Sequence, residues 1–100
     1  MSQHKYLNYD SKGRCVVISN DKPLSLYSLQ KLVGGYIEFV PCGDYTACIN
    51  EDGLLKKLPV NQAYPQFVGD IVLGRMHHDQ KTEENVFIGA GVVRHAQVVT

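Results

Sequence analysis

The spacing of the apolar residues changes abruptly near the middle of the chain, and this change limits the fold more than any other feature. From residue 26 to residue 33, leucine and valine recur three and four positions apart, as on one face of an α-helix. Ser25 is placed to cap the first turn, and Gly34 and Gly35 can form a left-handed stop. Residues 36–40 then alternate with a period of two, which is typical of a β-strand. The pattern predicts a short amphipathic helix that leads directly into a strand.

Further strands are predicted on both sides of the helix. A β-branched run at residues 13–19 ends in a turn at Asn20 and Asp21. The remaining predicted strands lie at residues 45–49, 54–58 and 68–74, with one bent strand or two strands within residues 86–99. Residues 1–10 show no clear period, residues 41–44 stop the strand before them, and the polar residues 75–85 predict an exposed loop.

These elements indicate the fold class. The helix must bury its leucine side chains, and the face of a sheet is the surface available for this. We therefore expect an α+β fold: an antiparallel sheet of about five or six strands with one amphipathic helix packed on one face. One hundred residues can form one such core, so residues 1–100 are expected to be a single domain.

The charge balance and the hydropathy limit the partners. Ten Lys and Arg residues balance ten Asp and Glu residues, so the chain lacks the strong positive field that gathers nucleic acid, and nucleic acid is a disfavoured partner. No apolar run approaches the roughly 20 residues that span a bilayer, and the first ten residues lack the core of a signal peptide. We expect a cytoplasmic protein with no membrane partner.

The cysteines and histidines give no metal site. Cys15, Cys42 and Cys48 form no CxxC pair, which argues against a disulfide framework and a zinc site. Cys15 and Cys48 lie in apolar runs, where thiols usually behave as small buried apolar groups. His77 and His78 are adjacent on a predicted loop, where their rings point in different directions. We therefore predict structural thiols and solvated histidines, with no metal and no cofactor.

Residues 49–61 hold the densest group of polar side chains, and two interpretations remain open. The segment is either a turn, with Gly53 at positive φ and Asn50 bonded to its own backbone, or one wall of a ligand pocket. Asn61 follows Pro59 without an obvious helix or strand to cap, so its amide is a candidate for ligand binding. A calcium loop is disfavoured, because leucines occupy the positions of the later ligands.

Aromatic and cationic residues complete the candidate site. Tyr36 is expected on the strand face away from the helix, where its ring can stack on a base, and Tyr64 beside Pro65 could form a second aromatic wall. The candidate ligand-binding residues are Tyr36, Asn50, Lys56, Asn61, Tyr64, Arg75 and Arg94. No motif pairs a nucleophile with a base, so we name no catalytic residue and favour a protein that is not an enzyme.

Three stretches resemble, in order, the conserved blocks of a family of small phage and bacterial proteins known as domain of unknown function 3846. They are LQKLVGGYIEFV, INEDGLLKKLPVNQAY and VGDIVLG, within roughly residues 26–74. The family name carries no reaction. The resemblance implies a phage or mobile-element accessory protein, which would act in the cytoplasm of the host cell.

By analogy with other small phage proteins, the expected function is binding. The chain would sequester a small nucleotide-like ligand, as an anti-defence sponge against a signal used in antiviral defence. We expect a homo-oligomer, because pockets at subunit junctions can surround a ligand, and the apolar residues 92–99 are a candidate strand for self-pairing. The alternative is a protein-protein inhibitor that binds a host defence enzyme through the same strand edge or the Tyr36 face.

Overall fold

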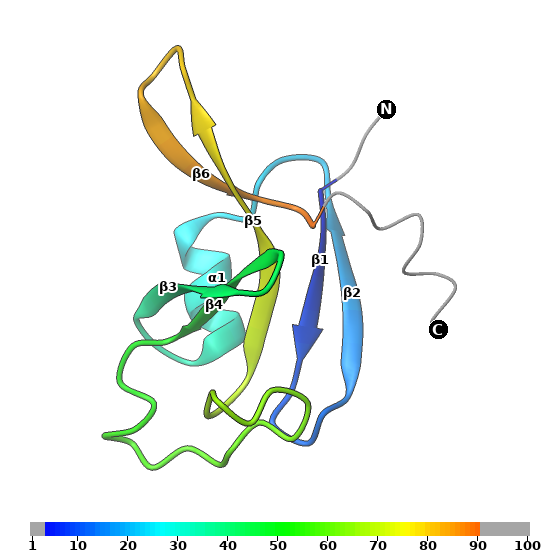
Figure 1. Ribbon diagram of the computed structural model, residues 1–100, viewed down its shortest axis with the longest axis vertical. Coiled ribbons are helices and arrows are strands. Elements are labelled where there is room, and N and C mark those ends of the chain that lie inside the picture. Colours follow the sequence, from blue (N-terminus) through cyan, green and yellow to red (C-terminus); the bar gives the residue numbers. More distant parts are fainter. Residues whose placement is uncertain (1–3, 91–100) are drawn as a thin grey trace.

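The structure, a computed structural model, describes residues 4–90. The elements in this range are β1 (His4–Tyr9), β2 (Cys15–Asn20), α1 (Leu26–Val33), β3 (Ile37–Cys42), β4 (Tyr45–Asn50), β5 (Ile71–Asp79) and β6 (Glu84–Ile88), as Figure 1 shows. The strands form an antiparallel sheet in the order β2-β1-β5-β4-β3, and β6 pairs with the second half of β5. The predicted fold class, an antiparallel sheet with one helix packed on it, is confirmed.

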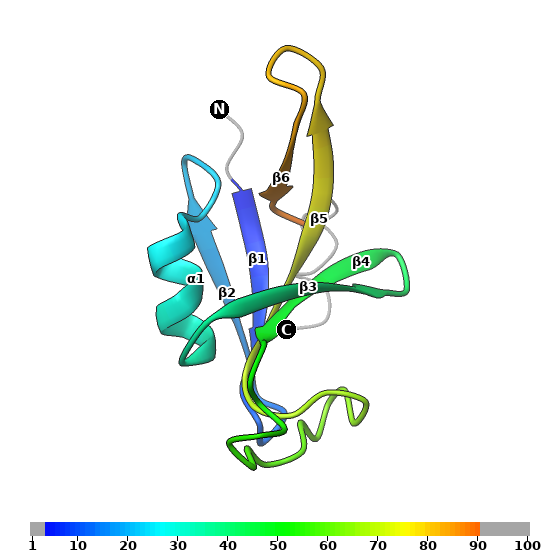
Figure 2. The ribbon, with the colours of Figure 1, turned by 90° about the vertical axis from the view of Figure 1, so that its left-hand side faces the viewer.

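The helix begins and ends where the sequence predicts. The Ser25 hydroxyl accepts a hydrogen bond from the Ser28 amide at 3.1 Å, as an N-cap does. Gly34 has φ 83°, and the amides of Gly34 and Gly35 both donate to the carbonyl of Gln30. The helix packs against β3, β4 and β5, and Figure 2 shows it on one side of the strands.

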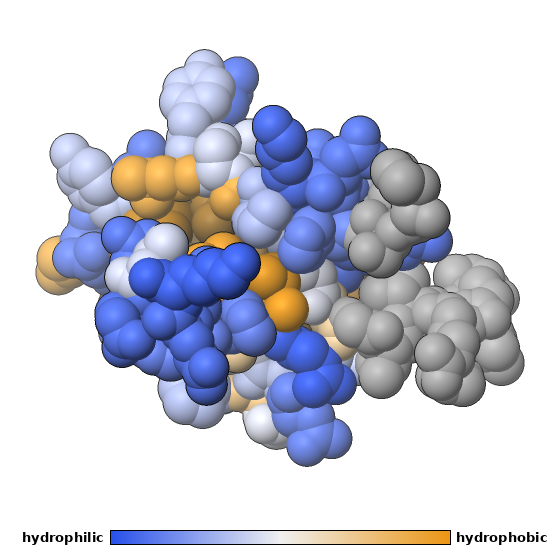
Figure 3. All heavy atoms as spheres, turned by 90° about the horizontal axis from the view of Figure 1, so that it is seen from above, coloured by the Kyte–Doolittle hydropathy of each residue, from blue (hydrophilic) through white to orange (hydrophobic). Residues whose placement is uncertain are grey.

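Strand β5 is the centre of the sheet, and its second half forms a projecting hairpin with β6. This hairpin, residues 75–88, is called the arm. Its residues 71–74 are buried between β1 and β4, whereas residues 75–79 pair only with β6. The β5–β6 hairpin extends beyond the rest of the molecule in Figures 1 and 2. A Cβ on Gly74 would lie 2.8 Å from the Phe87 ring. Glycine at this position therefore allows β5 and β6 to approach each other closely. Seen from above, the arm has a hydrophilic tip with apolar side chains beside it (Figure 3).

Three predictions about the strands were wrong, and one strand, at residues 4–9, had no prediction. Residues 54–58 form no strand, because residues 51–57 are a series of turns in which Lys57, at φ 57°, prevents an extended chain. Residues 75–85 are mostly strand, since a two-stranded arm exposed on both sides shows no apolar alternation. Residues 4–9 are a strand whose one fully buried side chain is Tyr6. Pro41 lies inside β3, which tolerates it as an edge strand.

Two expectations about single residues were also wrong. Gly53 does not have a positive φ; it is buried, and a Cβ there would lie 2.8 Å from the side chain of Val68. Cys15 is exposed, because β2 lies at the edge of the sheet, whereas Cys48 is fully buried as expected. Burial raises the pKa of the Cys48 thiol to about 12.

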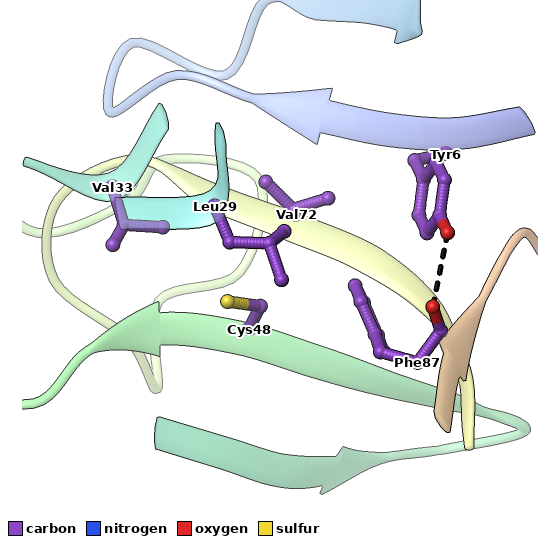
Figure 4. Packing of buried hydrophobic residues seen from close by; sticks show 6 residues of the cluster. All are labelled: Tyr6, Leu29, Val33, Cys48, Val72 and Phe87. Atoms are coloured by element: carbon purple, nitrogen blue, oxygen red, sulfur yellow. Dashed lines mark hydrogen bonds between the residues drawn. The ribbon is translucent and has the colours of Figure 1, made fainter. Parts of the chain in front are cut away.

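The core has one cluster on each face of the sheet. Beneath the helix lie Tyr6, Leu29, Val33, Cys48, Val72 and Phe87, which Figure 4 shows together. The opposite face is covered by Phe67, from the loop before β5, over Ala47, Ile71 and Leu73. Tyr6 is the one polar side chain in the first cluster: its hydroxyl donates to the carbonyl of Phe87 at 3.0 Å and accepts from the amide of Leu24 at 3.2 Å.

We predict that Tyr6→Phe lowers the free energy of unfolding by about 1–3 kcal/mol, because the amide of Leu24 and the carbonyl of Phe87 lose their buried partner. Urea unfolding followed by circular dichroism measures the change. The control is Tyr27→Phe, since the Tyr27 side chain is 67% exposed. Equal stability of the wild type and Tyr6→Phe would contradict the prediction.

Candidate functional site

A hollow of about 340 Å³ lies where the end of α1, the start of β3 and the turns after β4 meet. Its lining residues are Gln30, Gly35, Tyr36, Asp52 and Lys56. Two of the seven candidate residues, Tyr36 and Lys56, therefore come together here, 20 positions apart in the sequence. Tyr36 is 68% exposed, as expected for a ring that faces away from the core.

Asn50 holds the segments that line this hollow in place through hydrogen bonds to the backbone. Its side-chain Nδ2 donates to the carbonyl of Val33, the last residue of the helix, at 3.0 Å, and its Oδ1 accepts from the amide of Asp52 at 2.8 Å. The amide of Glu51 donates to the carbonyl of Tyr36 at 2.8 Å. Both ends of the Asn50 amide are thus occupied within the fold. Asn50 positions the residues of the hollow and is not itself among its lining residues.

Gly35 brings the Lys56 ammonium close to the backbone. A Cβ on Gly35 would lie 2.8 Å from Lys56 Nζ and 3.0 Å from Asn50 Nδ2, so any other residue would displace one of these groups. The position next to the last turn of α1 suits an ammonium, because the unpaired carbonyls at a helix C-terminus carry partial negative charge. Lys56 therefore has a structural reason to lie over the helix end as well as a place in the hollow.

The polar groups of the hollow have no partner within residues 4–90. The carboxylate of Asp52, the ammonium of Lys56, the hydroxyl of Tyr36 and the side-chain amide of Gln30 make no hydrogen bond or ion pair with any described residue. The hollow thus offers an aromatic ring, one cation, one anion and one amide to a ligand. This set suits a flat molecule that both donates and accepts hydrogen bonds.

Asn61 lies in the loop before β5, and both ends of its side-chain amide are occupied. Its side chain is completely buried and donates to the carbonyls of Tyr9, Asp10 and Gly69, while its Oδ1 accepts from the amides of Ala63 and Tyr64. These five bonds fold the loop of residues 59–70 onto the β1–β2 turn. A group so engaged has no capacity left for a ligand, so we assign Asn61 a structural role.

The other candidate residues lie apart from the hollow. Tyr64 packs edge-on against Tyr9, with ring centroids 5.1 Å apart, and burial raises the pKa of its hydroxyl. Arg75 donates through Nε to the carbonyl of Ala90, and its guanidinium lies 5.5 Å from the centroid of the Tyr45 ring. Arg94 and residues 92–99 lie outside the described residues.

The described part of the chain contains no group of three or more His, Cys, Asp and Glu residues arranged to hold a metal ion. His78, on the arm, has Nδ1 at 3.1 Å from Asn85 Oδ1 and Nε2 at 3.5 Å from a Glu83 oxygen. None of the helices within residues 4–90 has the length and hydropathy to cross a bilayer.

Gln30, Gly35 and Asp52 were not among the candidate residues identified from the sequence. The sequence did hold a signal for Gln30. A stop at Gly34 places the carbonyl of Gln30 under the glycine amides, so this residue must lie at the end of the helix that Tyr36 follows.

We predict that Asn61→Ala destabilises the protein by about 2–4 kcal/mol, because several buried backbone groups lose their partner at once. Thermal or urea unfolding measures the loss. Gln62→Ala is the matched control, since it removes an exposed amide side chain from the neighbouring position. A change in Asn61→Ala no larger than in the control would show that the Asn61 bonds do not hold the loop.

A protein-family model matches most of the chain. The model of the family described as Domain of unknown function (DUF3846) matches residues 5–86, which includes the whole of the stretch whose blocks resemble that family and extends it on both sides. No curated protein and no solved structure matches the chain.

Proposed function

We propose that this chain, which belongs to the family of domain of unknown function DUF3846, is a non-enzymatic binding protein that captures a small nucleotide-like ligand. It would act as a phage-type accessory protein in the cytoplasm of a host cell, where capture of a signalling nucleotide would counter an antiviral defence. The observation that supports this proposal is the meeting of Tyr36 and Lys56 in one hollow, beside polar groups that have no partner within residues 4–90.

Each side chain of the hollow has a role in this proposal. The ring of Tyr36 stacks on the base, because every base offers a π-face to an aromatic side chain. Asp52 accepts hydrogen bonds from N–H groups on the edge of the base, and Gln30 can both accept and donate them. Lys56 binds a phosphate or a carbonyl oxygen of the ligand.

The charge of the hollow limits the ligand further. Among the described residues that line it, Lys56 is the one cation and Asp52 is the one anion, and the C-terminus of α1 adds partial negative charge. A triphosphate would bring several negative charges to this site without enough cations to balance them. The hollow therefore favours nucleosides and ligands with one or two bridging phosphates over nucleoside triphosphates.

The proposal predicts that some members of a panel of nucleosides, cyclic nucleotides and linear nucleotides raise the melting temperature. A ligand at a hundredfold excess over its Kd adds about 2.7 kcal/mol to the stability of the native state. Tyr36→Ala should reduce the shift and weaken binding in calorimetry by roughly five- to 150-fold, since a base stacked on an aromatic ring gains about 1–3 kcal/mol.

The matched control for this experiment is Tyr27→Ala. Tyr27 is 67% exposed, almost the same as the 68% of Tyr36, but it lies outside the hollow. The control should bind like the wild type. A panel without any shift, or an equal loss in both variants, would refute nucleotide capture at this hollow.

A second candidate function is supported by the leucines beside the hollow. Leu54 and Leu55 are 81% and 85% exposed on the turns that carry Lys56. Two adjacent apolar side chains with this exposure are typical of contacts with another protein. In this alternative the chain inhibits a host defence enzyme, and the Tyr36 face is part of the contact.

We expect the two functions to separate in a direct binding assay with a purified host enzyme. If inhibition is the function, the double variant Leu54→Ser, Leu55→Ser should no longer bind the host enzyme, whereas its binding of any nucleotide should be unchanged. Leu26→Ser is the control, because Leu26 is a 59% exposed leucine on the helix. Unchanged enzyme binding in the double variant would exclude these leucines as the contact.

A further inference from the structure

The outer edge of β2 has none of the features that keep sheet edges from pairing. Residues Cys15–Asn20 include no charged residue and no proline, and their register with β1 continues through all six residues without a bulge. The helix packs on β3, β4 and β5, and among the described residues the two valines of β2, which point to opposite faces of the sheet, stay 59% (Val16) and 38% (Val17) exposed. This edge is a long, apolar template for another strand.

The hydrogen-bond pattern shows which peptide groups point outward. The amide of Asp10 donates to the carbonyl of Arg14, so this pair is of the hydrogen-bonded kind. Hydrogen-bonded and non-bonded pairs alternate along an antiparallel ladder. The peptide groups of Val16 and Ile18 therefore face β1, and those of Cys15, Val17 and Ser19 face the open edge. They have no backbone partner among the described residues outside their own ladder.

We propose that the outer edge of β2 pairs with the same edge of a second copy of this chain. The two strands run antiparallel around a two-fold axis at Val17. Val17 then faces Val17 of the second copy, Cys15 faces Ser19, and Val16 faces Ile18. Each pair whose peptide groups point outward exchanges two backbone hydrogen bonds, and the exposed valines become buried.

Two alternative registers, shifted by two residues in either direction, are less favourable than this one. Only registers that place outward-facing residues opposite one another can form a ladder. A shift by one step of two residues toward Asp21 places Arg14 opposite Lys22 of the other copy, which brings like charges together. A shift in the other direction runs into the turn at Gly13, whose φ is 89°. The register centred on Val17 avoids both.

The dimer leaves the hollow free. β2 and β3 are at opposite ends of the strand order, and the hollow lies at the start of β3. Each copy therefore keeps its own hollow, and the inference is independent of the proposed function.

The first test measures the mass of the full chain at micromolar concentration by analytical ultracentrifugation. The wild type should be a dimer, and Val17→Lys, which places two ammonium groups at the two-fold axis, should be a monomer with an unchanged circular dichroism spectrum. Val17→Pro should give the same result, because the amide of Val17 faces away from β1. Val60→Lys is the control, since it changes a 55% exposed valine outside β2 and should stay a dimer.

The second test is a cross-link. In Ser19→Cys, the new thiol lies opposite Cys15 of the other copy, so mild oxidation should give a covalent dimer on a non-reducing gel. Asn20→Cys is the matched control, because its thiol lies one position out of register and should not cross-link efficiently. A monomeric wild type would overturn the proposal. So would a dimer that survives Val17→Lys, or equal cross-linking in the two cysteine variants.

Discussion

The hydroxyl of Tyr6 connects three parts of the fold that are far apart in the sequence. It accepts from the amide of Leu24, where the chain enters the helix, and donates to the carbonyl of Phe87, in the last strand of the arm. Tyr6 itself lies in β1, in the centre of the helix-side core. Because one buried group satisfies both backbone partners, the approach of the helix and the return of β6 toward β1 depend on the same atom. A phenylalanine would fill the same space but could fix neither segment.

Two buried asparagines do similar work in the loops. Asn50 joins the last turn of the helix to the turns after β4, and Asn61 closes the loop before β5. These loops have little regular secondary structure, so their shape depends on side-chain amides that bond to the backbone. The result matters for binding, since a hollow whose walls are already fixed requires little ordering when a ligand enters.

The sequence predicted elements whose signals are local. The helix with its cap and glycine stop was predicted because each signal lies within a few residues, and β2, β3 and β4 were predicted from short β-branched or alternating runs. β1 and most of the arm were missed because their strands bury few side chains, so no period of two is visible. Asn50 and Asn61 were identified as unusual, but an amide that binds a ligand and an amide that binds the backbone look alike in a sequence. Only the partners found in three dimensions distinguish them.

The contact between Gly35 and the Lys56 ammonium links two positions that are distant in the sequence. The space that a Cβ would need at position 35 is taken by the end of the side chain at position 56. In family members that keep this geometry, a larger residue at the first position would require a shorter side chain at the second. The two positions should therefore vary together during evolution, and the long cation should occur where the glycine is retained.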